Sequence, residues 1–172
     1  MPLLEGSIIN LDIALYVPYE PADTCYHGDT STTVGVGEIS EKSQRLLQAT
    51  KEALKAGIDV CGPLTSYSKI GKAIEAVAHK YGMQVVKDLC GHGVGKDYHQ
   101  YPIILHYHNE DAGAMAPGTV FTIEPCLVEG VDQHFTSPED HFSICSLDGG
   151  RGAQEEHTVM VTDTGVEVLT QL

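Results

Sequence analysis

The segment Leu89–His108 reads LCGHGVGKDYHQYPIILHYH and holds four of the nine histidines of this chain. Glycines flank His92 on both sides, and glycine lets a backbone turn sharply or approach a ligand closely. His99 follows a further glycine, so two imidazoles can face one small volume. Imidazole is a common metal ligand and an acid–base group near neutral pH. The segment therefore predicts a functional site, although each histidine taken alone also fits an ordinary hydrogen-bonded polar residue.

The composition describes one globular domain. The chain has 172 residues, 42% of them hydrophobic and 20% charged, which is enough for a single core. A net charge of −14 argues against binding to nucleic acid or to an anionic membrane surface. The five cysteines form no CxxC pair, which disfavours a disulfide framework or a zinc knuckle. We expect residues 1–172 to form one domain in a cytoplasmic, reducing compartment, with no membrane span and no signal peptide.

Two strand-like segments near the start of the chain each carry an acid. Residues 7–17 (SIINLDIALYV) hold Asp12 at their centre, and residues 26–37 (YHGDTSTTVGVG) hold Asp29. The turn-rich connection between the segments predicts a β-hairpin. Facing positions in a hairpin lie roughly 5 Å apart, which is close enough to share one ion. A carboxylate within an apolar strand is costly unless it is paired or bound to a metal.

The rest of the chain predicts two helices and several strands. A helix capped by Ser40 runs to about residue 56, and a second one spans 66–81 and stops at Gly82. Both have one apolar side and are expected to be scaffold. Strands are expected over 83–90, over 119–129 and, as an antiparallel pair, within 152–169.

Three further acids lie in the predicted strands. Glu124 directly precedes Pro125, and proline in a strand marks an edge or a bulge. Glu155 and Glu156 lie in the first strand of the final pair, where either can be the residue that joins a site.

The acids and His92 share one explanation. The candidate ligands are Asp12, Asp29, His92, Glu124 and one of Glu155 or Glu156. Carboxylates can bridge two cations about 3.5–4 Å apart, and water bound between them loses a proton near neutral pH. Oxygen ligands with one imidazole and no thiolate suit Mn, Fe(II), Co or Zn. His99 can donate to a carbonyl oxygen on which negative charge develops. The residues thus favour metal-dependent hydrolysis of an amide or ester.

Six motifs resemble those of the type I methionine aminopeptidases, in the order in which that family has them. They are NLDI (10–13), HGDTS (27–31), GHGVGKDYH (91–99), LHY (105–107), FTIEP (121–125) and AQEEHT (153–158). The resemblance extends from about residue 3 to residue 169. The GHGVG and LHY forms resemble type I rather than type II enzymes or the prolidases.

The resemblance implies a fold and a set of roles. The fold is the α+β pita-bread (creatinase/aminopeptidase-like) fold, an antiparallel sheet flanked by helices. Asp12 would chelate one of two divalent ions, Asp29 and Glu156 would bridge both, and His92 and Glu124 would complete the other. His99 would contact the scissile carbonyl group, and Glu124 is also the candidate for handling the proton of the attacking water. Phe142 would lie near the methionine side chain.

The resemblance also implies a substrate and a setting. The reaction is removal of the initiator methionine from nascent polypeptides whose second residue is small, with the ribosome as an expected place of action. A monomer in the cytoplasm is expected, and an organellar location stays open. One alternative is a catalytically inactive module of the same fold that binds metal or a partner. A prolidase-like exopeptidase is disfavoured by the type I motifs.

The sequence departs from the family pattern in three places. The family has an N-terminal portion before the point that Met1 matches, so we expect an incomplete, N-terminally truncated domain with exposed apolar faces. The connection between Asp12 and Asp29 is longer than usual, and extra residues at a hairpin tip are tolerated. Glu155 replaces an aromatic residue. Because neighbours on a strand point in opposite directions, Glu155 is expected to point away from the metals.

Overall fold

The computed structural model describes residues 2–20, 24–131, 134–136, 139 and 143–171. The paired strands within these residues are antiparallel. The elements in chain order are β1 (Ile8–Tyr19), β2 (Thr24–Gly35), α1 (Glu41–Asp59), α2 (Ser68–Tyr81), β3 (Gln84–Val85), β4 (Cys90–Gly93), β5 (Gln100–Leu105), β6 (Val120–Ile123), β7 (Cys126–Val128), β8 (His134–Thr136), β9 (Ile144–Ser146), β10 (Gly152–Gln154), β11 (His157–Val161) and β12 (Val166–Val168).

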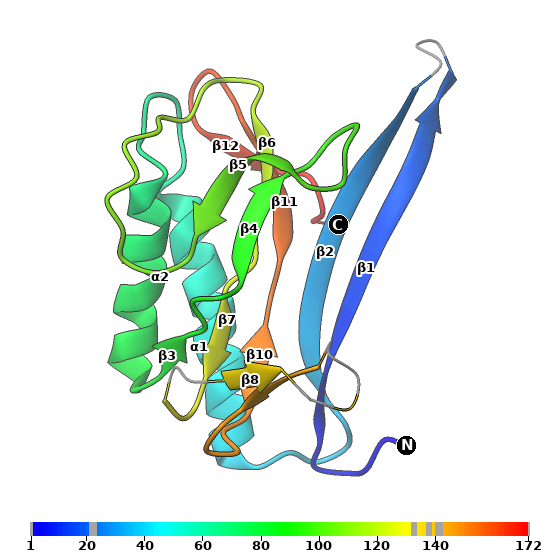
Figure 1. The fold of residues 1–172 in the computed structure, drawn as a ribbon, viewed down its shortest axis with the longest axis vertical. Coiled ribbons are helices and arrows are strands. Elements are labelled where there is room, and N and C mark those ends of the chain that lie inside the picture. The colour runs from blue at the N-terminus through cyan, green and yellow to red at the C-terminus, as the bar shows by residue number, and fades with distance from the viewer. Residues whose placement is uncertain (1, 21–23, 132–133, 137–138, 140–142, 172) are drawn as a thin grey trace.

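The strands form a layer between the helices and a long hairpin (Figure 1). A five-stranded sheet has the order β12-β11-β6-β4-β5, and a three-stranded sheet has the order β10-β7-β3. Helices α1 and α2 pack together against these sheets, and the β1–β2 hairpin stands on the other side. An isolated bridge between Ser31 and Glu156 joins the hairpin to the point where β10 gives way to β11.

Both helices begin or end for the reasons that the sequence indicates. The Ser40 side chain accepts a hydrogen bond from the Ser43 amide at 3.2 Å, which confirms it as the N-cap of α1. Gly82 adopts the left-handed conformation with φ 71° and ends α2, as predicted. The faces between helices and sheets form the core, whose fully buried members include Leu46, Ile70, Ile74, Phe121 and Ile123.

Three of the predicted strands are divided between the two sheets. The segment 83–90 forms β3 and the start of β4, the segment 119–129 forms β6 and β7, and the segment 152–161 forms β10 and β11. The second break falls at Glu124–Pro125, where proline has no amide proton for the ladder. The third falls at Glu155–Glu156. As a result Glu124 and Glu156 lie at the junction of the two sheets rather than within a continuous strand.

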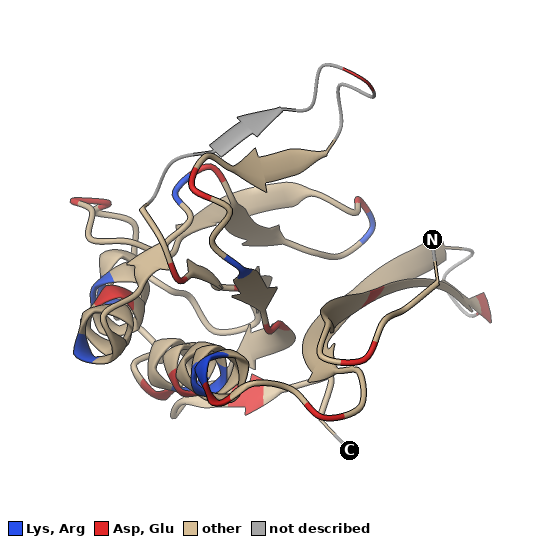
Figure 2. Ribbon diagram, turned by 90° about the horizontal axis from the view of Figure 1, so that it is seen from below, with Lys and Arg blue, Asp and Glu red and all other residues tan. Residues whose placement is uncertain are grey.

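The hairpin has an uncovered apolar face. Leu11, Ile13, Leu15 and Val17 alternate along β1 and are exposed, which confirms the expectation of an exposed apolar surface. Figure 2 shows that Lys and Arg lie on the helices and on loops of the other part of the molecule, whereas the hairpin has none. Among the described residues, neither helix is long and apolar enough to cross a membrane.

Candidate metal centre

The GHG motif forms β4, which is a strand rather than the sharp turn suggested by its glycines. A Cβ atom at Gly91 would overlap the carbonyl oxygen of Thr122 in β6, and one at Gly93 would overlap that of Tyr101 in β5. The glycines are therefore needed because the neighbouring strands approach closely, and the idea that they make room for a ligand is wrong. A register shift between His92 and Gly93 locally disrupts the ladder beside the site.

The two ring nitrogens of His92 have different surroundings. Nδ1 lies 3.1 Å from the carbonyl oxygen of Gly93, which can only accept, so Nδ1 carries a proton. Nε2 lies 3.6 Å from Asp29 Oδ2 and 3.5 Å from Glu124 Oε1. Burial lowers the pKa of His92 and so favours the neutral ring, with a lone pair on Nε2. Three electron-pair donors then converge on one point, and a cation stabilises such an arrangement.

The hairpin contributes Asp12 and Asp29, but these are not directly opposite each other. Asp12 pairs with Ser31, and Asp29 pairs with Ala14. The two acids are therefore diagonal neighbours, which lie about 7–8 Å apart in an antiparallel pair, and the predicted facing arrangement is wrong. Both still line one cavity. Asp29 is buried whereas Asp12 is largely exposed, so the burial cost anticipated for both acids is smaller at Asp12.

Glu124 is held by three residues that the sequence did not single out. Thr122 Oγ1 donates to Glu124 Oε1 at 2.8 Å, and Gln154 Nε2 donates to Oε2 at 3.1 Å. The backbone amide of Glu124 donates to Nε2 of the buried His106 at 3.2 Å. Burial lowers the pKa of His106 to about 3, so this ring is neutral and able to accept. The LHY motif thus carries a residue that supports the position of Glu124. The only sequence indication of this role was that LHY belongs to the same set of family motifs as the predicted ligands.

The Glu155–Glu156 pair is resolved in favour of Glu156. Glu156 is buried and lines the same cavity as Asp29 and His92. Its backbone amide donates to Ser31 O at 2.9 Å, which sets it beside the hairpin. Glu155 instead accepts from Thr32 Oγ1 at 3.0 Å and from the Thr33 amide at 3.2 Å, and it lines a different cavity. The prediction that Glu155 points away from the site is confirmed.

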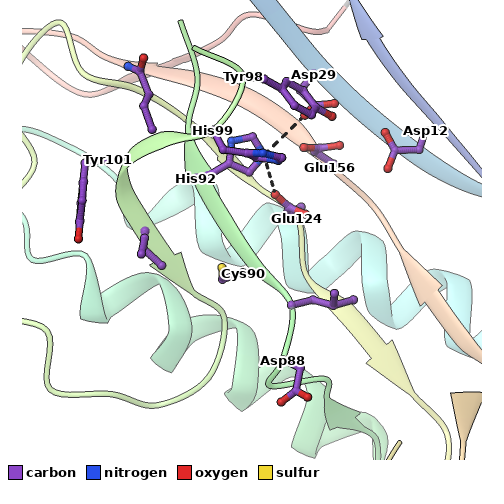
Figure 3. Close-up of a pocket in the computed structure, with 13 residues that line it drawn as sticks. Asp12, Asp29, Asp88, Cys90, His92, Tyr98, His99, Tyr101, Glu124 and Glu156 are labelled. Carbon is purple, nitrogen blue, oxygen red and sulfur yellow. Dashed lines mark ion pairs between the residues drawn. The ribbon is translucent and has the colours of Figure 1, made fainter. Parts of the chain in front are cut away.

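The predicted ligands meet around one cavity of about 610 Å³. Asp12, Asp29, His92, Glu124 and Glu156 all line it, together with His99, and Figure 3 shows their side chains converging from separate strands. Ligand atoms of Asp29, His92 and Glu156 lie within 4.8 Å of one another. The cavity lining contains no Lys or Arg. Asp29 Oδ1 is buried and has no hydrogen-bond partner within the described part of the chain. The donor set therefore fits a divalent cation.

The acids of the cavity perturb one another strongly. Burial raises the pKa of Glu156 to about 9, and the charges of Glu124, Asp29 and Asp12 add to the shift. Burial raises the pKa of Glu124 to about 7, against the opposing effect of its bonds from Thr122 and Gln154. The pKa of Asp12 is also raised, by burial and by Asp29. Without a cation these carboxylates cannot all ionise near neutral pH, whereas bound metal favours their ionised form.

The structure describes His99 but not Phe142. The His99 ring lies 4.3 Å from the His92 ring, centroid to centroid, at the wall of the cavity. A group bound there has an imidazole donor on one side and carboxylates on the other, which suits polarisation of a carbonyl group and removal of a proton from water. Phe142 lies outside the described residues, so its predicted place near a substrate side chain stays a prediction.

Known proteins similar to this chain are mainly aminopeptidases. A model of metallopeptidase family M24 matches residues 1–163. Methionine aminopeptidase 1B, chloroplastic, of Arabidopsis thaliana is 44% identical over 169 residues, which are 98% of this chain and 44% of that protein. Methionine aminopeptidase 1D, mitochondrial, of Mus musculus is 39% identical over 171 residues, 99% of this chain and 49% of that protein. The chain therefore spans about half the length of these relatives.

Solved structures give the same result for the fold. A methionine aminopeptidase from Rickettsia prowazekii superposes with a TM-score of 0.91 at 35% identity, covering 99% of this chain and 67% of that one. A prolidase from Pyrococcus furiosus superposes with a TM-score of 0.71 at 23% identity, covering 98% of this chain and 42% of that one. The second likeness shows the fold alone. The expected α+β pita-bread fold is confirmed.

Proposed function

We propose, since this chain belongs to metallopeptidase family M24, that residues 1–172 act as one catalytic domain that removes N-terminal methionine from polypeptides. The observation that carries the proposal is the convergence of four carboxylates and one imidazole on a cavity lined by no Lys or Arg. The names of these relatives, both methionine aminopeptidases, support methionine as the residue removed. Nascent chains with a small second residue are the proposed substrates, and cytoplasmic location, action at the ribosome and a monomeric state remain predictions.

The five acidic and imidazole ligands would hold two divalent ions among Mn, Fe(II), Co and Zn. Asp29 and Glu156 would be shared between the ions, Asp12 would belong to one, and His92 and Glu124 to the other. Such ions, when bound, make coordinated water acidic and polarise a carbonyl oxygen. The proposed assignment accounts for the buried, unpartnered Asp29 Oδ1 and for the unprotonated Nε2 of His92.

Two side chains are proposed to move or hold protons during hydrolysis. Glu124 takes the proton of the attacking water, because its carboxylate lines the cavity and is fixed in place by hydrogen bonds from Thr122 and Gln154. His99 donates a hydrogen bond to the carbonyl oxygen of the scissile peptide as negative charge develops there.

The proposal is tested by methionine release from a Met-Ala-Ser peptide. Protein stripped with a chelator and reloaded with Mn²⁺ or Co²⁺ is expected to release methionine, and the chelated protein is expected not to. Asp29→Ala removes release, whereas Asp163→Ala, which alters an exposed acid in the turn after β11, leaves it unchanged. Folded, metal-loaded protein without turnover contradicts the proposal and leaves the inactive metal-binding module. Faster cleavage of an Xaa-Pro dipeptide than of the Met-Ala-Ser peptide favours a prolidase-like activity.

A further inference from the structure

Tyr98 lies at the centre of a group of histidine rings beside the metal centre. It belongs to the connection between β4 and β5 and lines the same cavity as the proposed ligands. Its ring centroid lies 4.3 Å from that of His99 and 5.7 Å from that of His92. A third imidazole, that of His27 on β2, lies 5.5 Å away. The side chain therefore separates the two cavity imidazoles from the hairpin.

The hydroxyl group of Tyr98 lies close to the carboxylate of Asp29, and burial together with this carboxylate raises the pKa of Tyr98. A phenol is protonated at neutral pH and an ionised carboxylate can only accept, so the hydroxyl is the group that can donate. Asp29 still has a buried oxygen, Oδ1, that lacks a partner in the described structure. The hydroxyl can therefore orient the carboxylate while a lone pair stays available for a cation. Figure 3 shows the Tyr98 side chain against Asp29 at the mouth of the cluster.

The connection that carries Tyr98 is attached to the strand that carries Asp29. The backbone amide of His27 donates to the Gly95 carbonyl oxygen at 2.8 Å, and Nδ1 of His27 lies 3.0 Å from the same oxygen. His27 is two residues from Asp29 on β2, so its side chain points to the same face of the hairpin. Tyr98 and Asp29 are thus held in register by contacts that do not depend on the hydroxyl itself.

We propose that Tyr98 is a positioning residue of the metal centre, whose hydroxyl orients Asp29 and whose ring orients His92 and His99. The inference rests on the proposed function, because it assigns Asp29 to a cation and His99 to the substrate carbonyl. Partners that orient a ligand from outside the coordination sphere contribute about 10–100-fold to metal affinity when they are lost. The two parts of the side chain have separable effects, since the hydroxyl acts on metal affinity and the ring acts on turnover.

The hydroxyl is tested by calorimetric titration of Mn²⁺ into metal-free protein. Tyr98→Phe is expected to weaken Mn²⁺ binding by about 10-fold, with the melting temperature of the metal-free protein within about 2 °C of wild type, a change of under 1 kcal/mol. Tyr26→Phe, an exposed tyrosine three positions from Asp29, is the matched control and is expected to bind like wild type. Binding by Tyr98→Phe within twofold of wild type overturns the inference.

The ring is tested by turnover at saturating Mn²⁺. Tyr98→Phe is expected to recover kcat to within about threefold of wild type, since full occupancy compensates for weaker binding. Tyr98→Leu is expected to remain at least about 10-fold slower, because His99 loses its packing partner. Equal kcat for the two variants overturns the part of the inference that concerns the ring.

One measurement needs no variant and separates this inference from the proposed function. The chain has no tryptophan, so ultraviolet-excited emission comes from tyrosine. Zn²⁺ is expected to change that emission in proportion to occupancy, because it alters the carboxylate to which Tyr98 donates. Full Zn²⁺ occupancy with unchanged emission overturns the role of Tyr98 but leaves the proposed function standing. Wild-type protein that binds no metal at all overturns the proposed function as well.

Discussion

The two faces of the β1–β2 hairpin have opposite composition and the reverse of the usual burial. On the inner face Asp29, Ser31 and Thr33 are only 3%, 5% and 1% exposed. On the outer face Ile13 and Leu15 are 56% and 61% exposed. Hydropathy alone would place these faces the other way round. Burial in this hairpin therefore follows the side that faces the cavity, and it leaves Asp29 Oδ1 and Ser31 Oγ without a hydrogen-bond partner among the described residues.

The inner face is stabilised by hydrogen bonds to the break between β10 and β11. Thr33 Oγ1 donates to Gln154 O at 2.6 Å, Thr158 Oγ1 donates to Asp29 O at 2.7 Å, and the Glu156 amide donates to Ser31 O at 2.9 Å. These bonds satisfy the backbone on both sides. The charges of the Asp29 carboxylate and of the neighbouring Glu156 carboxylate are not balanced by any Lys or Arg of the cavity lining, and the proposed cation would balance them.

The largest effect expected from the comparison is that of Glu156→Gln on the inner face. The substitution keeps the shape of the side chain but removes a proposed bridging charge, so methionine release should fall by at least about 100-fold. At pH 8 the metal-free Glu156→Gln variant should have a higher melting temperature than the metal-free wild type. Burial and neighbouring acids raise the pKa of Glu156 to about 9 and oppose its ionisation, and glutamine removes this cost. Activity and thermal melting measured on one preparation check both results.

Ile13→Thr on the outer face is the control for that experiment. Ile13 is exposed and is not one of the residues that line the cavity, and threonine suits a strand. Its release of methionine should stay within about twofold of wild type, since surface substitutions change stability by roughly 0.5 kcal/mol or less. A comparable loss in both variants would mean that the hairpin acts as a unit and that its two faces are not independent.

The second effect is the pH dependence of the metal-free protein. Folding raises the pKa of Glu124 to about 7 and that of Glu156 to about 9, so the stability they contribute is present at low pH and is lost as pH rises from about 4.5 to 9. Folding lowers the pKa of His106 to about 3, so its contribution is present above pH 6.5 and is lost as pH falls below that value.

Between pH 4.5 and 6.5 the two glutamates lose more stability than His106 gains, so the melting temperature in chelator should be highest near pH 4.5 and should fall towards pH 9. Saturating Mn²⁺ should flatten the alkaline limb, because the ion stabilises the ionised carboxylates. Thermal melting across this range, with chelator and with metal, separates the two limbs. Equal slopes above pH 6.5 in both conditions would show that Glu124 and Glu156 are not metal ligands.

Much of the candidate site could be predicted because its residues are unusual in their local sequence surroundings. Acids in apolar segments and a histidine between glycines identified Asp12, Asp29, His92 and Glu124 before any contact was known. The alternation of a strand was enough to assign Glu155 and Glu156 opposite directions. The resemblance then chose Glu156, and the contacts of Glu155 with Thr32 and Thr33 agree with that choice.

What could not be predicted depends on neighbours that are distant in sequence. The glycines of the GHG motif are required by the carbonyl groups of β5 and β6, which local pattern cannot reveal. The hairpin register places Asp12 and Asp29 diagonally, and register is set by the turn and by packing. Strand breaks at Glu124 and Glu155 depend on which sheet each half joins. Tyr98 lies within the GHGVGKDYH motif, but nothing in the sequence indicated that its side chain would lie beside Asp29 and the histidine rings.

The third effect concerns the residue that attaches the inner face to the sheet break. Glu155 is 7% exposed, and its carboxylate accepts from the Thr33 amide. Glu155→Ala leaves that buried donor without a partner, which costs about 1–3 kcal/mol. Glu155→Gln keeps an acceptor and should cost less. Urea denaturation of both variants, with Glu167→Ala, an exposed residue of β12, as control, measures the difference. Equal stability of the Ala and Gln variants would show that the hydrogen bond is unimportant.

The smallest expected effect concerns the outer face of the hairpin and is a change in the self-association of the protein. Leu11, Ile13, Leu15 and Val17 form a continuous exposed apolar row on β1, and such rows on strands promote self-association. The double substitution Ile13→Thr with Leu15→Thr should lower the associated fraction at high protein concentration while leaving Mn²⁺ affinity unchanged, because neither residue lines the cavity. Sedimentation velocity at several concentrations, with calorimetry on the same samples, measures both quantities. Unchanged association would show that a different surface of the molecule is responsible for self-association. Weaker Mn²⁺ binding would mean that packing on the outer face helps to set the position of Asp29 on the inner face.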